Sequence, residues 1–268
     1  AYAYGANGES ERLIAEALGE QRDQIVIATK GGLHWDTNGQ RVLDARPQTL
    51  RRECEASLRR LQTDHVDLLY LHAPDPATPL AESAGTLGEL LAEGKTRAVG
   101  VSNLTLSQLQ TFHATCPVSA LQPPYNLLQR QIEDDLLPWC RDQRIAVIPY
   151  WPLLKGLLAG KLARDHRFAD GDGRAKYPMF QGTEWQKNQD FVDRLRDIAA
   201  TEGKTVAQVA VNWVLNQPGI TSALCGAKRA SQITETAAAG GWSLPAAATL
   251  RLAEALNQRG CPMAPGAV

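Results

Sequence analysis

Residues 57–75 read SLRRLQTDHVDLLYLHAPD and contain the end of a helix, a short turn and a strand. Apolar residues recur at helical spacing up to Leu61, which predicts an amphipathic helix over Arg46–Leu61. The run that follows, Val66–His72, is apolar on both faces, as strands of a parallel sheet are when both faces of the sheet are covered. This stretch therefore predicts a helix that leads into a buried strand.

The same unit recurs along the chain as a short apolar run, a turn and a helical period. Alternation of strands and helices at this spacing predicts a parallel α/β architecture. The predicted strands are Ile25–Thr29, Val66–His72, Arg97–Val101, Val118–Gln122, Ile145–Tyr150 and Ile220–Leu224. The predicted helices are Glu9–Leu18, Arg46–Leu61, Leu80–Glu93, Leu106–Ala114, Ile132–Asp142, Trp185–Ala200, Val206–Asn216, Ala230–Ala239 and Pro245–Gln258.

Polar and aromatic residues follow several of these strands, as in the segments 29–31, 102–103 and 150–152. Catalytic groups of a TIM barrel gather at the carboxyl ends of its strands. A doubly wound sheet would carry a glycine-rich turn after its first strand, and the sequence contains neither GxGxxG nor GxxxxGK[ST]. The pattern favours a barrel, with the aperiodic segment 153–184 overhanging its active face.

Composition excludes several classes of protein. Lys and Arg number 28 and Asp and Glu 29, so the chain lacks the positive charge of a nucleic-acid-binding surface. No apolar run approaches the ~20 residues that span a bilayer. The five cysteines are widely spread and form no CxxC pair, so we expect no metal site, no disulfide scaffold and a reducing cytoplasmic location. The sequence does not indicate the oligomeric state.

Three candidate catalytic residues are weak when taken singly. His72 ends a strand and is compatible with an ordinary buried histidine. Lys30 also ends a strand, where a lysine often extends its charged end toward solvent. Tyr4 lies in a turn-like stretch. Only their combination with other segments points to a function.

Seven segments of the chain read AYAYGxxGESE, IATKGG, SLRRLQTDHVDLLYLHAPD, LLAEGKTRAVGVSN, LQPPYNLLQR, PYWPLLKGLLAGK and CGAKRASQ. Together they resemble the aldo-keto reductase superfamily of NADPH-dependent (β/α)8 barrel oxidoreductases. They occur in the family's order and run from Ala1 to about Ala239. The resemblance implies an α/β fold of the TIM (β/α)8 class and an NADP-dependent oxidoreductase.

The resemblance assigns catalytic roles to the three candidates. It implies that Tyr4 protonates the carbonyl oxygen, that Lys30 lies beside Tyr4, and that His72 orients and polarises the carbonyl. These roles are chemically coherent, because an ammonium group stabilises a phenolate and lowers its pKa from ~10. A neutral imidazole N–H can stabilise the negative charge that develops on the carbonyl oxygen.

The resemblance also implies a binding site for NADPH/NADP+. Ser102, Asn103 and Gln122 would bind the carboxamide, and Tyr150 would stack on the nicotinamide ring. Taken alone, these residues fit a helix cap and core packing, and the Lys228–Arg229 pair fits a solvated basic turn. The full implied set is Ser102, Asn103, Gln122, Tyr150, Trp151, Leu153, Lys155, Gly156, Lys161, Gly226, Lys228, Arg229 and Gln232.

The chain departs from the family pattern at three places. Trp151 stands where serine is common, and Thr236 stands where asparagine is common near the adenine. The family's catalytic aspartate would lie upstream of Ala1, as would strand 1, helix 1 and strand 2. We therefore expect residues 1–268 to be a single, N-terminally incomplete barrel domain, poorly soluble and close to inactive as written.

Two functions of different classes follow from these observations. The first is an enzyme that transfers a hydride between NADPH and an aldehyde or ketone, with Tyr4 as general acid. The alternative is a non-catalytic NADPH-binding module, such as a redox sensor or a channel-type subunit. The joint presence of Tyr4, Lys30 and His72 favours the enzyme, because cofactor binding alone needs none of them. The expected partner is a small-molecule carbonyl compound, and no nucleic-acid or membrane partner is expected. Trp35, segment 153–184 and the residues at the strand ends are expected to select the substrate.

Overall fold

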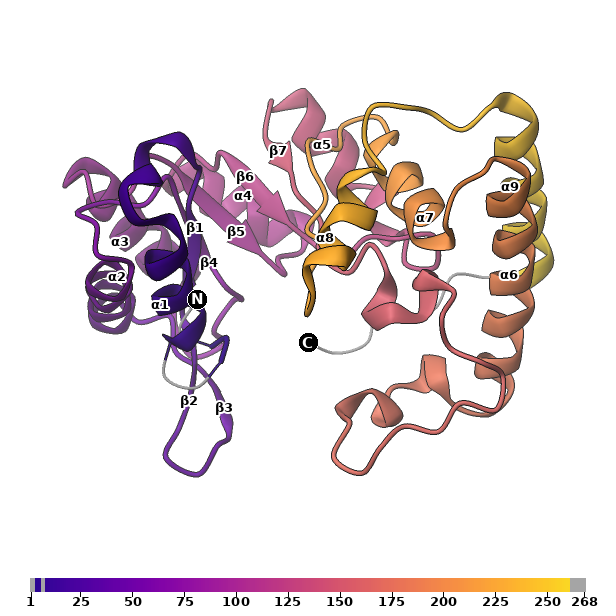
Figure 1. Cartoon of the computed structure of the whole chain (residues 1–268). Coiled ribbons are helices and arrows are strands. Elements are labelled where there is room, and N and C mark those ends of the chain that lie inside the picture. The colour runs from indigo at the N-terminus through magenta and orange to yellow at the C-terminus, as the bar shows by residue number, and fades with distance from the viewer. Residues whose placement is uncertain (1–2, 6–7, 261–268) are drawn as a thin grey trace. The chain divides into compact units, whose positions relative to one another are not determined.

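A computed structural model describes residues 3–5 and 8–260 of the chain (Figure 1). The chain divides into two compact units, one formed by residues 1–123 and 140–146, the other by residues 124–139 and 147–268. Within helix α5 (Leu136–Asp142), the chain leaves the second unit and returns to the first. The single barrel domain expected over the whole chain stays a prediction.

The first unit is built on a parallel sheet. Its strands are β1 (Ala28–Gly31), β4 (Leu68–Leu71), β5 (Val99–Ser102) and β6 (Ala120–Gln122), in this spatial order, with β7 (Ala146–Val147) next. Every residue of β4 and β5 is buried, as their uninterrupted apolar character predicts. The predicted α/β class with a parallel sheet is confirmed, although each strand is shorter than its apolar run.

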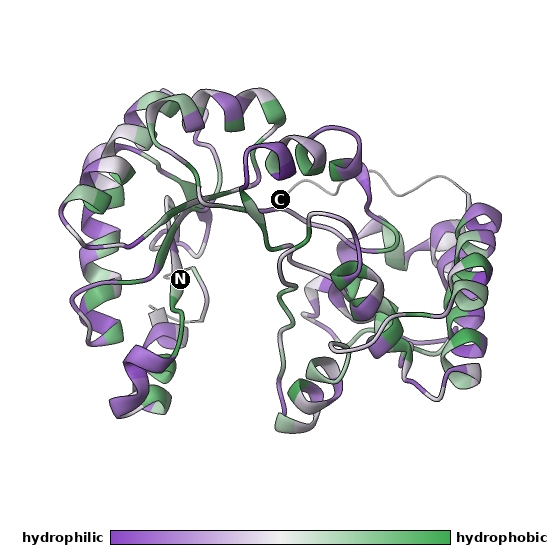
Figure 2. Cartoon of the chain, turned by 90° about the horizontal axis from the view of Figure 1, so that it is seen from above, coloured by the Kyte–Doolittle hydropathy of each residue, from purple (hydrophilic) through white to green (hydrophobic). Residues whose placement is uncertain are grey.

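Four helices accompany this sheet and pack in chain order, each on the next. They are α1 (Glu9–Leu18), α2 (Pro47–Leu61), α3 (Leu80–Ala92) and α4 (Leu106–Thr115). Proline is the first residue of α2. An N–H at this position would have no partner within the helix, so proline, which lacks an N–H, costs no helical hydrogen bond there. In Figure 2 the strands are green along most of their length while the helices carry both colours, as amphipathic helices on an apolar sheet do.

An antiparallel hairpin follows β1 and is absent from the predicted elements. It consists of β2 (Leu33–Trp35) and β3 (Arg41–Leu43). The Asp36 carboxylate accepts hydrogen bonds from two backbone amides of the connecting turn, at 2.8 Å each. Gly39 has φ 71°, a conformation that glycine adopts readily. Strands of three residues are too short to show a recognisable alternation of apolar and polar residues.

The second unit is mainly helical. It contains α6 (Gly182–Thr201), α7 (Val206–Leu215), α8 (Ala230–Ala237) and α9 (Ala246–Arg259). Helix α6 packs against α7 and α9, and α7 packs against α8 (Figure 1). Three short 3₁₀ segments, Leu154–Ala159, Gly173–Lys176 and Pro178–Phe180, occupy the aperiodic stretch before α6.

The prediction of a sixth strand over Ile220–Leu224 is wrong. The structure has only a parallel bridge between Ile220 and Val147 there. Thr221 N donates to Val147 O and Leu224 N donates to Pro149 O, each at 2.9 Å. Pro149 has no N–H, so the facing segment cannot return the bonds that a ladder requires.

In the part of the chain that the structure describes, no helix is both long and apolar enough to cross a membrane. Cys54, Cys116 and Cys140 are buried free thiols, and Cys225 is a partly buried free thiol. Cys261 lies outside the described residues. Within the same ranges, no three His, Cys, Asp or Glu side chains lie close enough together to hold a metal ion.

Candidate active site

Three predicted catalytic side chains meet in the first unit. The Tyr4 hydroxyl oxygen lies 3.4 Å from Lys30 Nζ and 3.5 Å from His72 Nε2. The Tyr4 and His72 rings meet edge to face, with centroids 5.6 Å apart. The ammonium of Lys30 also lies 5.0 Å from the centroid of the Tyr4 ring. Residues separated by up to 68 positions in the sequence thus surround one phenol oxygen.

The register of the sheet brings Lys30 and His72 together. The His72 amide follows β4 and donates to the carbonyl of Gly31, the last residue of β1, at 2.9 Å. Asn103 follows β5, and its side-chain amide donates to the His72 carbonyl at 2.9 Å. Asn103 has φ 61°, a left-handed conformation that asparagine tolerates better than most residues. Hydrogen bonds at the carboxyl ends of adjacent parallel strands therefore hold His72 beside Lys30.

Burial sets the charge of both basic groups. It lowers the pKa of Lys30 from 10.5 to about 8, so the ammonium is charged at pH 7 and largely neutral by pH 10. Burial, together with the positive charge of Lys30, lowers the pKa of His72 to about 3. The imidazole is therefore neutral at physiological pH. Within residues 3–5 and 8–260, Lys30 has no carboxylate partner, and the His72 Nδ1 atom is buried without a hydrogen-bond partner.

Tyr4 has access to solvent, with 48% of its surface exposed. Burial of the rest raises the pKa of its phenol above 10.0, and the positive charge of Arg41 acts in the opposite direction. A neutral phenol beside an ammonium and a neutral imidazole can donate a proton to an oxygen that gains negative charge. The ammonium then stabilises the phenolate that remains. Contacts of 3.4–3.5 Å are long, as catalytic hydrogen bonds often are without substrate.

Tyr70 is a neighbour of this cluster that the sequence did not single out. It pairs with Lys30 on β1 and with Gly100 on β5, so the three residues lie in one row across the sheet. Lys30 Nζ lies 5.8 Å from the centroid of the Tyr70 ring. A Cβ atom on Gly100 would overlap that ring. The missing side chain of Gly100 therefore makes room for the aromatic residue beside Lys30.

The predicted carboxamide-binding residues lie at the ends of β5 and β6. Ser102 and Gln122 are buried, and the Ser102 hydroxyl donates to the Gln122 carbonyl at 2.6 Å. The side-chain amide of Asn103 lies 3.1 Å from the Ser102 oxygen. The structure brings these three residues together beside the His72 backbone. Their grouping agrees with the prediction, while their role toward a cofactor stays a prediction.

The aromatic residues of the predicted cofactor site lie in the second unit. Tyr150 and Trp151 meet edge to face at 5.1 Å, and Trp151 meets Tyr177 at 6.3 Å. The ammonium of Lys155 lies 3.8 Å from the Trp151 ring centroid and 4.2 Å from that of Tyr177. Trp151 and Lys155 have φ 59° and 54°, strained values for these residues. The bulk of Trp151 thus serves to hold Lys155, a contact that sequence reasoning missed.

Several of the predicted phosphate-binding residues already form contacts within the protein. Lys161 forms an ion pair with Glu235 of α8 at 2.6 Å. The Leu153 carbonyl accepts from Gly156 N, which has φ 95° at a turn, and from Leu158 N. These contacts stabilise the fold of the loop around Lys155.

The N-terminus of α8 carries the remaining predicted residues. The Gln232 side chain accepts from the backbone amides of Lys228 and Arg229 at 2.7 and 3.2 Å. Gly226 precedes them, with open space around its α-carbon. The Thr236 hydroxyl donates back to the Gln232 carbonyl at 2.9 Å, so it is engaged by its own helix.

The two units each carry groups whose chemistry suits part of a nicotinamide cofactor. In the described part of the chain, the side chains of Lys228 and Arg229 form no ion pair, so two adjacent positive charges remain for an anion. Amide and hydroxyl groups of the kind at Ser102 and Asn103 suit a carboxamide. Taken unit by unit, the residues of the first unit fit the carboxamide of a nicotinamide and the basic pair of the second unit fits a phosphate.

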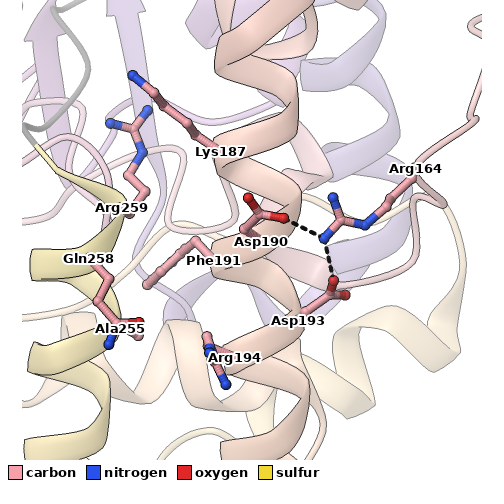
Figure 3. Close-up of a pocket in the computed structure, with 9 residues that line it drawn as sticks. All are labelled: Arg164, Lys187, Asp190, Phe191, Asp193, Arg194, Ala255, Gln258 and Arg259. Atoms are coloured by element: carbon pink, nitrogen blue, oxygen red, sulfur yellow. Dashed lines mark hydrogen bonds and ion pairs between the residues drawn. The ribbon is translucent and has the colours of Figure 1, made fainter.

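A hollow of about 400 Å³ lies between α6 and α9 and contains none of the predicted site residues (Figure 3). Arg164 bridges Asp190 and Asp193 at 2.6 and 2.5 Å along its wall. Arg259 is buried there and pairs with Glu184. Because Arg164 and Arg259 are both held in ion pairs, we assign the hollow a structural role.

The sequence also has clear relatives. The sequence model described as the aldo/keto reductase family matches residues 1–256. The aldo-keto reductase YhdN of Bacillus subtilis (strain 168) is 40% identical over 245 residues, covering 90% of this chain and 73% of that protein. The NADH-specific methylglyoxal reductase of Escherichia coli (strain K12) is 34% identical over 267 residues, covering 94% of this chain and 81% of that protein.

A solved structure agrees with the sequence matches. The glycerol dehydrogenase AKR11B4 from Gluconobacter oxydans aligns with a TM-score of 0.89 at 37% identity, covering 97% of this chain and 81% of that one. This match confirms the predicted fold class, the TIM (β/α)8 barrel.

Proposed function

The chain belongs to the aldo/keto reductase family, and on that premise we propose that it transfers a hydride between NADPH and the carbonyl carbon of an aldehyde or ketone. The observation that carries the proposal is the convergence of Lys30 and His72 within 3.5 Å of the Tyr4 hydroxyl oxygen. In this proposal Tyr4 is the general acid of carbonyl reduction and the general base of the reverse reaction.

Each of the three side chains has a different role toward the carbonyl oxygen. A bound NADPH would supply the hydride, and negative charge would then develop on the carbonyl oxygen. The neutral imidazole of His72 orients that oxygen through an N–H bond, and the Tyr4 hydroxyl delivers the proton. The ammonium of Lys30 stabilises the phenolate until a proton returns. Its pKa of about 8 keeps it charged at neutral pH.

The preference for NADPH rests on the basic pair before α8. Lys228 and Arg229 supply two cations for the 2′-phosphate, which adds about two negative charges. Ser102, Asn103 and Gln122 would hold the carboxamide, and Tyr150 would stack on the ring. A relative is named as NADH-specific, so the cofactor preference needs its own measurement. The buried free thiols of the first unit are compatible with a reducing cytoplasm as the proposed location.

The proposal is tested by following oxidation of NADPH and of NADH at 340 nm with a panel of aldehydes and ketones. The panel includes methylglyoxal, and glycerol is offered with the oxidised cofactors for the reverse direction. The sequence alone led us to expect a nearly inactive chain, but because Tyr4, Lys30 and His72 lie together we now expect turnover with at least one small carbonyl compound and a higher kcat/KM with NADPH. Tight NADPH binding without turnover of any compound would contradict the enzyme and favour the binding module.

A further inference from the structure

We propose that Trp35 is a positioning residue for Tyr4, because its indole N–H holds the backbone from which the phenol extends. The inference rests on the proposed function, in which Tyr4 is the proton donor. In the described part of the chain, Trp35 forms no hydrogen bond with the Tyr4 phenol, Lys30 or His72. It acts on the residue before Tyr4.

The segment that carries Tyr4 needs an external support. Residues 3–5 belong to no helix or strand, so no ladder fixes them. The Tyr4 carbonyl accepts from Ser10 N at 3.5 Å, which is a long contact. By contrast, Trp35 Nε1 donates to the Ala3 carbonyl at 2.9 Å, and Ala3 is buried. Of these two described contacts, the indole bond is thus the shorter and better formed.

The support under Trp35 is itself fixed. The Glu53 carboxylate, buried on α2, accepts from Gly32 N at 2.7 Å and pairs with His34 Nδ1 at 2.9 Å. Gly32 directly precedes β2, and His34 is the middle residue of that strand, which ends in Trp35. A buried carboxylate therefore anchors the hairpin to the helix layer, and the hairpin holds the Tyr4 segment.

The hairpin brings a second group to the phenol. Trp35 pairs with Arg41 across the two strands, so both residues lie at the same level of the hairpin. The positive charge of Arg41 counteracts the rise in the Tyr4 pKa that burial causes. The same supersecondary element thus sets both the position of Tyr4 and part of its electrostatic environment.

Loss of the tether should act on the chemical step. A misplacement of a reacting group by ~1 Å can cost about 100-fold in rate. Trp35→Phe keeps an aromatic ring and removes only the N–H donor and the larger ring area. We expect it to lower kcat by more than about 10-fold, because Tyr4 can no longer be held at the oxygen that it must protonate.

The matched control is Trp242→Phe. The indole of Trp242 also donates to a backbone carbonyl, that of Ala238, at 2.9 Å, but it belongs to the second unit. For both variants, kcat is measured per NADPH-binding site, so misfolded protein does not count. The inference predicts a fall in kcat for Trp35→Phe with unchanged Kd for NADPH, and parent-like kcat for Trp242→Phe. Equal kcat values in the two variants would overturn it.

A second readout is independent of turnover. The chain has six tyrosines, so 3-fluorotyrosine labelling gives six ¹⁹F resonances, and Tyr4→Phe identifies the one from Tyr4. We expect Trp35→Phe to shift or broaden the Tyr4 resonance in the apoprotein, while Trp242→Phe leaves it in place. Glu53→Gln, which weakens the hairpin anchor without changing Trp35, should move the same resonance.

The two readouts separate the inference from the proposed function. A parent protein that binds NADPH but turns over no carbonyl compound would refute the function, whereas the ¹⁹F spectrum would still test the tether. A Tyr4 resonance unmoved in both Trp35→Phe and Glu53→Gln would refute the positioning role even in an active enzyme.

Discussion

Replacing Lys30 by methionine should slow carbonyl reduction by about 30-fold. The Lys30 ammonium lies 3.4 Å from the Tyr4 oxygen. Two unit charges at this separation interact by roughly 5 kcal/mol at an effective dielectric constant of ~20. Because Tyr4 is half exposed, solvent screening reduces the usable part to roughly 2 kcal/mol. That loss of phenolate stabilisation corresponds to about 30-fold in rate.

The pH profile tests the same idea with a defined sign. The pKa of Lys30 is lowered to about 8, so the ammonium is lost as pH rises through that value, and the parent's kcat for reduction should fall above pH 8. The methionine variant has no such group and should lack this alkaline decline. The assay is single-turnover NADPH oxidation by stopped flow between pH 6 and 10, with Lys204→Met as control.

Lys204 is a suitable control because its ammonium also lies over an aromatic ring, 4.8 Å from that of Trp242, in the second unit. Its replacement should leave both rate and profile unchanged. A Lys30→Met enzyme within threefold of the parent rate, with the alkaline decline intact, would refute the role assigned to Lys30.

Three further outcomes follow from the structure. Alanine at both Lys228 and Arg229 should weaken NADPH binding by more than about 10-fold in a fluorescence titration, since charge-assisted bonds run roughly 1.5–3 kcal/mol; an equal loss for NADH would contradict the 2′-phosphate contact. Glu11 is buried and accepts hydrogen bonds from a threonine on β1 and an arginine on α2, both at 2.6 Å. Glu11→Ala should therefore lower the free energy of unfolding, measured by urea denaturation, by about 3–5 kcal/mol. A change below about 1 kcal/mol would show that the buried pair contributes little. Gly100→Ala should cost about 1–3 kcal/mol in the same assay because its methyl group overlaps the Tyr70 ring, and a neutral effect would mean that the sheet can relax there.

The sequence predicted the helices well. The predicted Glu9–Leu18 coincides with α1, and the predicted Leu106–Ala114 is one residue shorter than α4. Amphipathic periods of ten or more residues leave a clear signal. The exception is the predicted Ile132–Asp142, which is a short 3₁₀ segment followed by α5.

Elements that depend on distant partners were harder to predict. The hairpin was missed because its strands have three residues each. Ile220–Leu224 has the composition of a strand, but the segment facing it contains Pro149 and cannot form a ladder. Apolar composition alone does not show which partner a strand will have.

The candidate site divides in the same way. The grouping of Tyr4, Lys30 and His72 was predictable, because catalytic groups in this architecture follow the strands. The contact of Trp35 with Ala3 and the position of Tyr70 beside Lys30 were not, because both depend on register and turn geometry. The ion pair of Lys161 with Glu235 likewise required the packing of α8.

The most direct test of the proposed chemistry is the turnover of Tyr4→Phe, which removes only the hydroxyl that Lys30 and His72 surround. The variant is compared with the parent for NADPH affinity by fluorescence and for kcat with the best aldehyde of the panel. General acid catalysis contributes about 10²–10⁴-fold, so we predict a kcat lower by at least 100-fold with an unchanged Kd for NADPH. A Tyr4→Phe protein that reduces the aldehyde within tenfold of the parent rate would contradict the account.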